Sequence, residues 1–247
     1  MIAIVTGASS GIGRQFAKEL DNKNFSEIWL IARRKERLED LSKKLKTKTK
    51  ILDYDLLDEN SFLKFKDLLE KENPKIKLLI NSAGMGVNDY FISTDIKLIE
   101  KMIKLNALSI TKICHIAYPY MISNSAIVNV ASVAAFIPQP KFSVYAASKS
   151  YVLSFSKSLN RELRKDKINV CALCPNPVAT EFFKYSKQSS MKSLFNEDIN
   201  HLVKKTLKNC YKKDIITTSK IARLILILSK IFPHNFIMWI EKVFKMY

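Results

Sequence analysis

Glycine is scarce in this chain, with only five among 247 residues. An average composition of about 7% glycine would give roughly 17. The glycines that remain are expected at positions where a Cβ atom cannot be tolerated, either because φ is positive or because the backbone approaches another group closely. All five glycines fall in two short segments, Thr6–Gly13 and Asn81–Gly86. We therefore expect each segment to lie against a ligand or against other backbone.

Cysteine, histidine and linker sequence are also sparse. The chain has four cysteines and three histidines, and no Pro/Gly/Ser-rich stretch divides it, so we expect one domain over 1–247. The first strand leads directly into the first glycine segment without room for a signal peptide, so we expect a cytoplasmic protein with reduced thiols. Cys171 and Cys174 form a CxxC inside an apolar run, without a second pair. This context predicts core packing, and no metal site is expected.

Acidic residues are too few to balance the basic ones. The chain has 23 Asp and Glu against 41 Lys and Arg, a formal net charge of +18. A charge of this size is compatible with binding to nucleic acid or to an anionic membrane surface. The basic residues are mostly lysines spread along the whole chain, and no nucleic-acid motif accompanies them. A solvated basic surface is therefore favoured, and no specific nucleic-acid partner is expected.

Short apolar runs alternate with amphipathic segments along the chain. The near-continuous apolar character of the runs is typical of strands that are buried on both faces. This order predicts an α/β fold, a Rossmann-like doubly wound parallel sheet flanked by helices, in which ligands bind beyond the carboxyl ends of the strands. We expect strands at 2–6, 27–32, 50–54, 76–81, 125–131, 168–174 and 214–217, and long helices at 95–116 and 143–165.

The ends of the first four strands carry a candidate dinucleotide site. The first glycine segment follows a strand and opens a helix, which makes an anion site suited to a pyrophosphate. The second strand ends in Arg33 and Arg34, where an NAD site would place an acidic residue. Because arginine matches phosphate oxygens, we expect NADP(H) to be preferred over NAD(H), with Arg33 as the main 2′-phosphate contact; the alternative is that both arginines are solvated. The expected cofactor residues of this region are Gly7, Ser9, Ser10, Gly11, Ile12, Gly13, Arg33, Arg34, Asp55, Leu56, Asn81, Ala83 and Gly84.

A candidate catalytic set follows the fifth strand. Ser132 ends that strand, and Tyr145 and Lys149 share one helix face because they are four residues apart. A tyrosine has an ordinary pKa of about 10, and a neighbouring ammonium is expected to lower it. The serine hydroxyl can hydrogen-bond a carbonyl oxygen that gains negative charge, while the tyrosine donates a proton to it.

Together these motifs resemble the short-chain dehydrogenase/reductase family over residues 1–225, and its NADP-preferring members in particular. The resembling motifs are TGxxxGxG at 6–13, an NNAG-like motif at 81–84, Asn106, Ser132, YxxxK at 145–149 and a proline motif at 175–180. The resemblance implies that Asn106 supports a proton-relay water, and that Tyr145, Lys149, Pro175, Val178 and Thr180 contact the nicotinamide half.

Two positions depart from the family pattern. Ser82 stands in place of the second asparagine, and Asn176 replaces a glycine in the proline motif, where the left-handed tolerance of asparagine is expected to preserve the turn. The apolar tail that builds a tetramer in many members is also missing, so a homodimer is expected instead.

The last quarter of the chain is expected to define the substrate. Residues 181–200 form an apolar candidate lid, and 219–247 form a hydrophobic helical extension. The extension is expected to cap the cleft, to dimerise, or to lie on an anionic membrane as an amphipathic helix.

We predict an NADPH-dependent oxidoreductase that interconverts a small-molecule ketone or aldehyde and an alcohol, on an apolar 3-oxoacyl or steroid-like substrate. The alternative is a non-enzymatic NADPH-binding scaffold or membrane-associated sensor.

Overall fold

The computed structural model describes residues 1–178, 197–236 and 238. Seven strands form one parallel sheet in the order β3-β2-β1-β4-β5-β6-β7. The strand order reverses between β1 and β4, and this reversal is where open α/β sheets bind ligands. The strands are β1 (Ile2–Thr6), β2 (Glu27–Ile31), β3 (Thr49–Leu52), β4 (Ile76–Asn81), β5 (Met121–Val130), β6 (Asn169–Leu173) and β7 (Ile215–Ile216).

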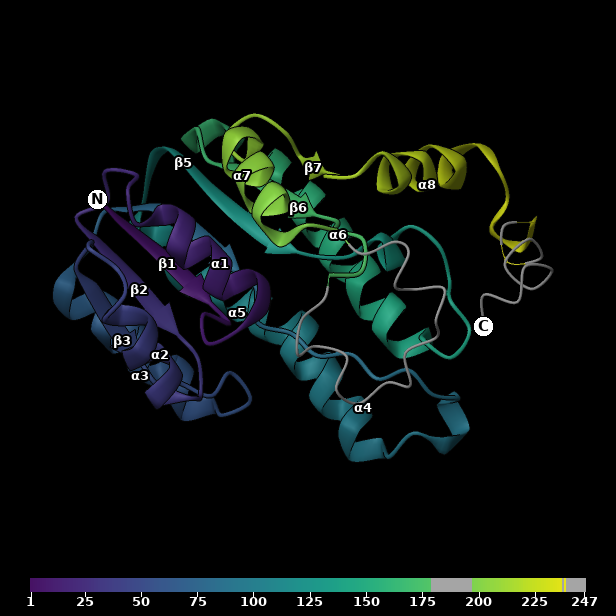
Figure 1. Ribbon diagram of the computed structural model, residues 1–247, viewed down its shortest axis with the longest axis horizontal. Coiled ribbons are helices and arrows are strands. Elements are labelled where there is room, and N and C mark those ends of the chain that lie inside the picture. The colour runs from purple at the N-terminus through teal and green to yellow at the C-terminus, as the bar shows by residue number, and fades with distance from the viewer. Residues whose placement is uncertain (179–196, 237, 239–247) are drawn as a thin grey trace.

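Helices cover both faces of the sheet (Figure 1). Short 3-10 turns lie at Phe91–Ser93 (η1), Tyr118–Tyr120 (η3), Val133–Ala135 (η4) and Leu163–Asp166 (η5), and a π turn lies at Lys104–Leu108 (η2). The α-helices are α1 (Gly11–Leu20), α2 (Lys35–Ser42), α3 (Glu59–Glu72), α4 (Ile96–Ile103), α5 (Ser109–Ala117), α6 (Ser143–Glu162), α7 (Ile199–Asn209) and α8 (Lys220–Ile231).

Two apolar layers hold these helices to the sheet. Successive side chains of a strand point to opposite faces, so Val5 packs with α1, α2 and α7 while Ile4 packs with α3, α5 and α6. All five residues of β1 and of β2 are buried. Cys171 and Cys174 belong to opposite layers and are buried free thiols, as a packing role requires.

The predicted sheet is confirmed, with differences at the element ends. β5 begins at Met121, four residues before the predicted strand, because its first four residues are half-buried or exposed and the polar Ser123 and Asn124 separate Met121 and Ile122 from the apolar run. The predicted helix over 95–116 is divided into α4 and α5 by the π turn. α7 begins at Ile199 and packs on α1, so the end of the expected lid over 181–200 is helical. The preceding lid residues, up to 196, lie outside the described residues.

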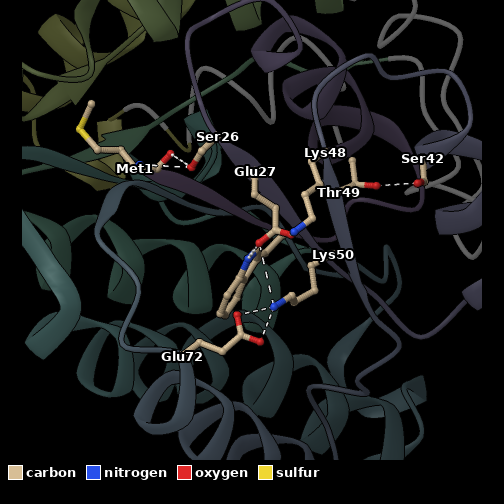
Figure 2. Close-up of polar contacts among 9 residues, drawn as sticks. Met1, Ser26, Glu27, Ser42, Lys48, Thr49, Lys50 and Glu72 are labelled. Atoms are coloured by element: carbon tan, nitrogen blue, oxygen red, sulfur yellow. Dashed lines mark hydrogen bonds and ion pairs between the residues drawn. The ribbon is translucent and has the colours of Figure 1, made fainter.

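A charged cluster closes the amino-terminal end of β2 and β3 (Figure 2). Glu27 accepts a hydrogen bond from Trp29 Nε1 at 2.7 Å and an ion pair from Lys48 at 3.2 Å. Lys50 pairs with Glu72 of α3, and its ammonium lies 4.7 Å from the centroid of the Trp29 ring. This cluster ties two strands and a helix together at the end opposite to the predicted site.

Candidate active site

A cleft of about 460 Å³ opens at the carboxyl ends of the strands, on both sides of the β1–β4 reversal. Gly13, Asn81 and Asn106 lie outside its lining, and Thr180 lies outside the described residues. The predicted residues that line the cleft are Gly7, Ser9, Ser10, Gly11, Ile12, Arg33, Arg34, Asp55, Leu56, Ala83, Gly84, Ser132, Tyr145, Lys149, Pro175 and Val178.

The two glycine segments lie against each other. Gly7 has φ +69°, and a Cβ atom there would stand 2.8 Å from the backbone nitrogen of Ala83. A Cβ atom on Gly13 would stand 2.5 Å from the carbonyl oxygen of Gly7. Thr6 Oγ1 also accepts hydrogen bonds from the backbone N–H groups of Ser82 and Ala83, at 3.1 and 3.2 Å. Glycine is therefore required at Gly7 and Gly13 by close backbone contacts.

The start of α1 fits the phosphates of a dinucleotide. The first turn of α1 contains no acidic residue, so the positive end of the helix dipole faces the cleft uncompensated. Arg34 donates to Ser9 Oγ at 3.0 Å and to Ser10 Oγ at 2.8 Å, which places a guanidinium beside the glycine loop. Arg33 lies 3.8 Å from Asp55 and its side chain is 64% exposed. Both arginines line the same cleft, and Arg34 makes the closer contacts with the loop.

Ser132, Tyr145 and Lys149 converge on the other half of the cleft. Ser132 lies two residues beyond the end of β5, and its Oγ accepts from the backbone N–H of Ala134 at 3.2 Å, which orients the hydroxyl. Tyr145 and Lys149 are buried on α6, and Lys149 Nζ donates to the Val130 carbonyl at 2.8 Å. The Lys149 ammonium lies 5.8 Å from the centroid of the Tyr145 ring. The spacing of the YxxxK motif therefore places its two functional groups together, as predicted.

Burial dominates the acid–base properties of this pair. Burial raises the pKa of Tyr145 to about 12, and the hydrogen bond with Ser132 offsets part of that rise. Burial lowers the pKa of Lys149 to about 8. The pKa of Tyr145 is therefore raised above its ordinary value and not lowered as expected, because desolvation of the phenolate outweighs the hydrogen bond with Ser132. Tyr145 is consequently a protonated acid at neutral pH.

Asn106 lies beneath the cleft, within the π turn. Its side chain accepts from the Met85 N–H at 2.9 Å and donates to the Met85 carbonyl at 2.8 Å. It also donates to Ser148 Oγ at 3.0 Å, and Ser148 in turn donates to the Tyr145 carbonyl at 2.7 Å. Asn106 thus connects the Met85 wall of the cleft to the helix that carries Tyr145.

Asn81 belongs to a second buried network. It donates to Asn129 Oδ1 at 2.8 Å, and Asn129 donates to Ser156 Oγ at 3.0 Å. This series runs from β4 through β5 to α6. It ties α6, the helix that carries Tyr145 and Lys149, to the sheet, so Asn81 acts here within the sheet and not at the cleft.

Other cleft residues have no motif in the sequence. Phe142 meets the Tyr145 ring edge-to-face, with centroids 5.3 Å apart. Asn176 is not among the described residues with positive φ, so the expected left-handed turn is wrong. Instead its side chain donates to Ser219 Oγ at 2.7 Å. That partner lies 43 residues away, which no local pattern indicates. The lining residues that the sequence did not single out include Tyr54, Met85, Leu105, Gln139, Phe142 and Pro177.

A family profile described as short chain dehydrogenase matches residues 1–190. The chain belongs to the short-chain dehydrogenase family of oxidoreductases. A human very-long-chain 3-oxoacyl-CoA reductase is 34% identical over 195 residues, which are 75% of this chain and 62% of that protein. The chain thus spans about three fifths of the length of this relative.

Solved structures of relatives share the fold. A short-chain dehydrogenase from Sphingobium yanoikuyae in complex with NADPH has a TM-score of 0.78 at 29% identity, over 88% of this chain and 86% of that one. A family member from Burkholderia phymatum in complex with NAD has a TM-score of 0.80 at 21% identity, covering 92% of each chain. The same fold thus occurs with NADPH and with NAD. The choice between the two cofactors depends on the residues that line the cofactor site and not on the fold.

Proposed function

We propose that this protein is an NADPH-dependent carbonyl reductase that interconverts a ketone or aldehyde and an alcohol. The observation that carries the proposal is the convergence of Ser132, Tyr145 and Lys149 in one cleft with the glycine loop and Arg34. A bound nicotinamide cofactor would supply the hydride in this reaction. The protein's own residues hold the cofactor, orient the carbonyl and move the proton.

Each residue of the catalytic set has a role that its position supports. Ser132 Oγ donates a hydrogen bond to the carbonyl oxygen, whose negative charge grows during reduction. Tyr145 donates its phenolic proton to that oxygen, and the raised pKa ensures that the proton is present at neutral pH. Lys149, held on the Val130 carbonyl, stabilises the phenolate that forms. Asn106 fixes the Met85 wall and supports the return of a proton to Tyr145 through water.

The preference for NADPH rests on charge. Arg33 and Arg34 both line the cleft at the end of β2, and the structural relative from Sphingobium is in complex with NADPH. Ser9 and Ser10 add hydroxyl donors beside Arg34. A 2′-phosphate bound at the end of β2 would therefore lie beside positive charge and hydrogen-bond donors.

The proposed substrate is apolar, a 3-oxoacyl thioester or a steroid-like ketone. The similarity to very-long-chain 3-oxoacyl-CoA reductases supports this class. The lining on the tyrosine side is also largely apolar, with Met85, Leu105 and Phe142.

The decisive experiment replaces Tyr145 by Phe. The variant should lose carbonyl-dependent NADPH oxidation by about 10²–10⁴-fold, the usual contribution of a positioned acid, while it still binds NADPH in a fluorescence titration. Isotope transfer from labelled NADPH to a panel of 3-oxoacyl and steroid ketones measures the activity. Full turnover by Tyr145→Phe would refute the mechanism. Cofactor binding without isotope transfer to any ketone would favour a non-enzymatic NADPH scaffold or sensor.

We also propose a cytoplasmic homodimer that contacts membranes peripherally through 219–247. Exposed Leu108 and Tyr151 on neighbouring helices support a dimer, which light scattering would detect as a doubled mass. Among the described residues, no helix is both long and apolar enough to cross a bilayer.

A further inference from the structure

α8 has two apolar faces, and one of them packs against the core of the protein. Ala222 is fully buried, and Ile225 and Leu226 pack against the core layer that contains Phe136 and Ile137. This inner face also contacts η4, the turn that directly follows Ser132. The outer face carries an exposed stripe at helical spacing. The stripe residues are Ile221, Leu224, Ile227 and Ile231, which are 40%, 55%, 45% and 66% exposed.

The charged residues of α8 all have one sign. Lys220, Arg223 and Lys230 are exposed, and α8 contains no acidic residue. The sequence has no Asp or Glu anywhere from 215 to 240. Arg223 and Lys230 are seven residues apart, so they lie on one side of the helix, along an edge of the stripe. Beyond the helix, exposed Phe232 and Phe236 stack with ring centroids 5.3 Å apart and prolong the apolar surface.

We propose that the outer face of α8 lies on an anionic lipid surface. The apolar stripe would enter the boundary between headgroups and acyl chains, while Arg223 and Lys230 meet the headgroup phosphates. A helix of 12 residues is about 18 Å long. It can lie in the membrane–water interface but cannot span the hydrocarbon core of a bilayer. A second copy fits this face poorly, because two-fold pairing would bring the three cations of α8 toward the same cations of the partner.

The docked helix would stand beside the catalytic cleft. Ser219 caps α8 by accepting from the Ala222 N–H at 3.0 Å, and the same hydroxyl accepts from Asn176 at 2.7 Å. Asn176 lies between Pro175 and Pro177, which both line the cleft. Figure 1 shows α8 (yellow) following β7 and extending away from the sheet. Lipid binding would therefore bring the cleft close to apolar ketones dissolved in the membrane, a consequence that rests on the proposed function.

Vesicle flotation of the full-length protein tests the surface. We expect flotation with phosphatidylcholine–phosphatidylserine vesicles and little with phosphatidylcholine alone. Arg223→Glu/Lys230→Glu should weaken partitioning at least about 25-fold, since each basic group near an anionic surface contributes about fivefold. Leu224→Ser/Ile231→Ser should weaken it similarly by removing the inserted side chains.

Matched controls come from α3. Lys64→Glu/Lys71→Glu makes the same charge change at the same spacing on another exposed helix, and Leu63→Ser alters a side chain that is 59% exposed. Both should leave partitioning within about twofold of the unmodified protein, because a surface held away from the lipid contributes little beyond a Debye length.

Three outcomes would overturn the proposal. The first is that the unmodified protein does not float with any vesicle. The second is that the α3 charge pair weakens flotation as much as the α8 pair, which would mean general charge attraction. The third is that the α8 variants change the mass found by light scattering without changing flotation, which would identify a protein interface. Reduction of a water-soluble ketone by the unmodified protein is measured in parallel without lipid. If no reduction is found, the result counts against the proposed enzyme and not against lipid binding.

Discussion

Arg33 and Arg34 are neighbours in the chain but have different surroundings. Arg34 donates to Ser9 and Ser10 at the start of α1, whereas Arg33 is largely exposed and lies 3.8 Å from Asp55. Adjacent residues at a strand end point in different directions, so the sequence alone could not rank the two arginines. The contacts with the glycine loop favour Arg34 as the stronger phosphate ligand, ahead of the predicted Arg33.

A pair of single variants tests this ranking. Arg34→Ala should lower the NADPH/NADH ratio of kcat/KM by roughly 10–100-fold, because a hydrogen bond to a charged group contributes about 1.5–3 kcal/mol. Arg33→Ala should lower the same ratio less. The ratio is measured with both cofactors on one ketone. A larger effect at Arg33 would restore it as the main contact, and no effect at either position would contradict the preference for NADPH.

The Tyr145–Lys149 pair also predicts a pH profile. Burial holds the pKa of Lys149 at about 8, below its usual value, so the ammonium is present below that pH and is lost as the pH rises through it. Tyr145, with a pKa of about 12, stays protonated throughout. We expect kcat/KM for reduction, at saturating NADPH, to be level below about pH 8 and to fall toward tenfold per pH unit above it.

Lys149→Arg provides the control for this profile. A guanidinium does not lose its proton in this range, so the variant should be slower but should lack the fall near pH 8. A level profile to pH 10 in the unmodified enzyme would show that Lys149 does not control the reaction.

At the scale of elements, the catalytic helix depends on a buried polar series. Asn129 is fully buried, and it links Asn81 of β4 to Ser156 of α6. Ser156 lies on the same helix as Tyr145 and Lys149 and is also fully buried. Amide groups that are sequestered from water are costly to leave unpaired. The series therefore fixes how α6 sits on the sheet.

Ser156→Ala should lower the free energy of unfolding by about 1–3 kcal/mol, because it removes the partner of the Asn129 amide. Ser158→Ala is the matched control, since Ser158 is exposed on the same helix and its change should stay within about 0.5 kcal/mol. Urea denaturation followed by circular dichroism measures both. Equal stability of the two variants would show that the series does not hold the helix.

The elements differ in how far the sequence predicts them. Buried strands are predictable because their apolar runs are nearly continuous, and the YxxxK spacing brings Tyr145 and Lys149 together through the geometry of any helix. The π turn at Lys104–Leu108 has no such signal, because four of its five residues are lysine, leucine or alanine, which favour an ordinary α-helix. The bond between Asn176 and Ser219 joins positions 43 residues apart, and only the assembled fold brings them together.

At the scale of the whole molecule, the two ends of the sheet have different tasks. The carboxyl end carries the cleft, with its glycine loop and catalytic set. The amino end carries the charged cluster of Glu27, Trp29, Lys48, Lys50 and Glu72 (Figure 2). The length of the strands separates the cluster from the cleft. A change in the cluster should therefore alter the stability of the protein without altering the rate of the proposed reaction.

Glu27→Ala tests this separation. The Glu27 side chain is only 12% exposed, and its loss would leave the buried Trp29 N–H without its acceptor and Lys48 without its partner. We expect the free energy of unfolding to fall by about 2–4 kcal/mol, as for other broken buried networks, while kcat and KM remain unchanged in the folded protein. Glu70→Ala removes the exposed Lys66–Glu70 pair on α3 and should cost less than about 1 kcal/mol. Because the cluster and the cleft share β2 but lie at its opposite ends, a large fall in kcat for Glu27→Ala at a temperature where the variant is folded would show that strain passes along the strand to Arg33 and Arg34.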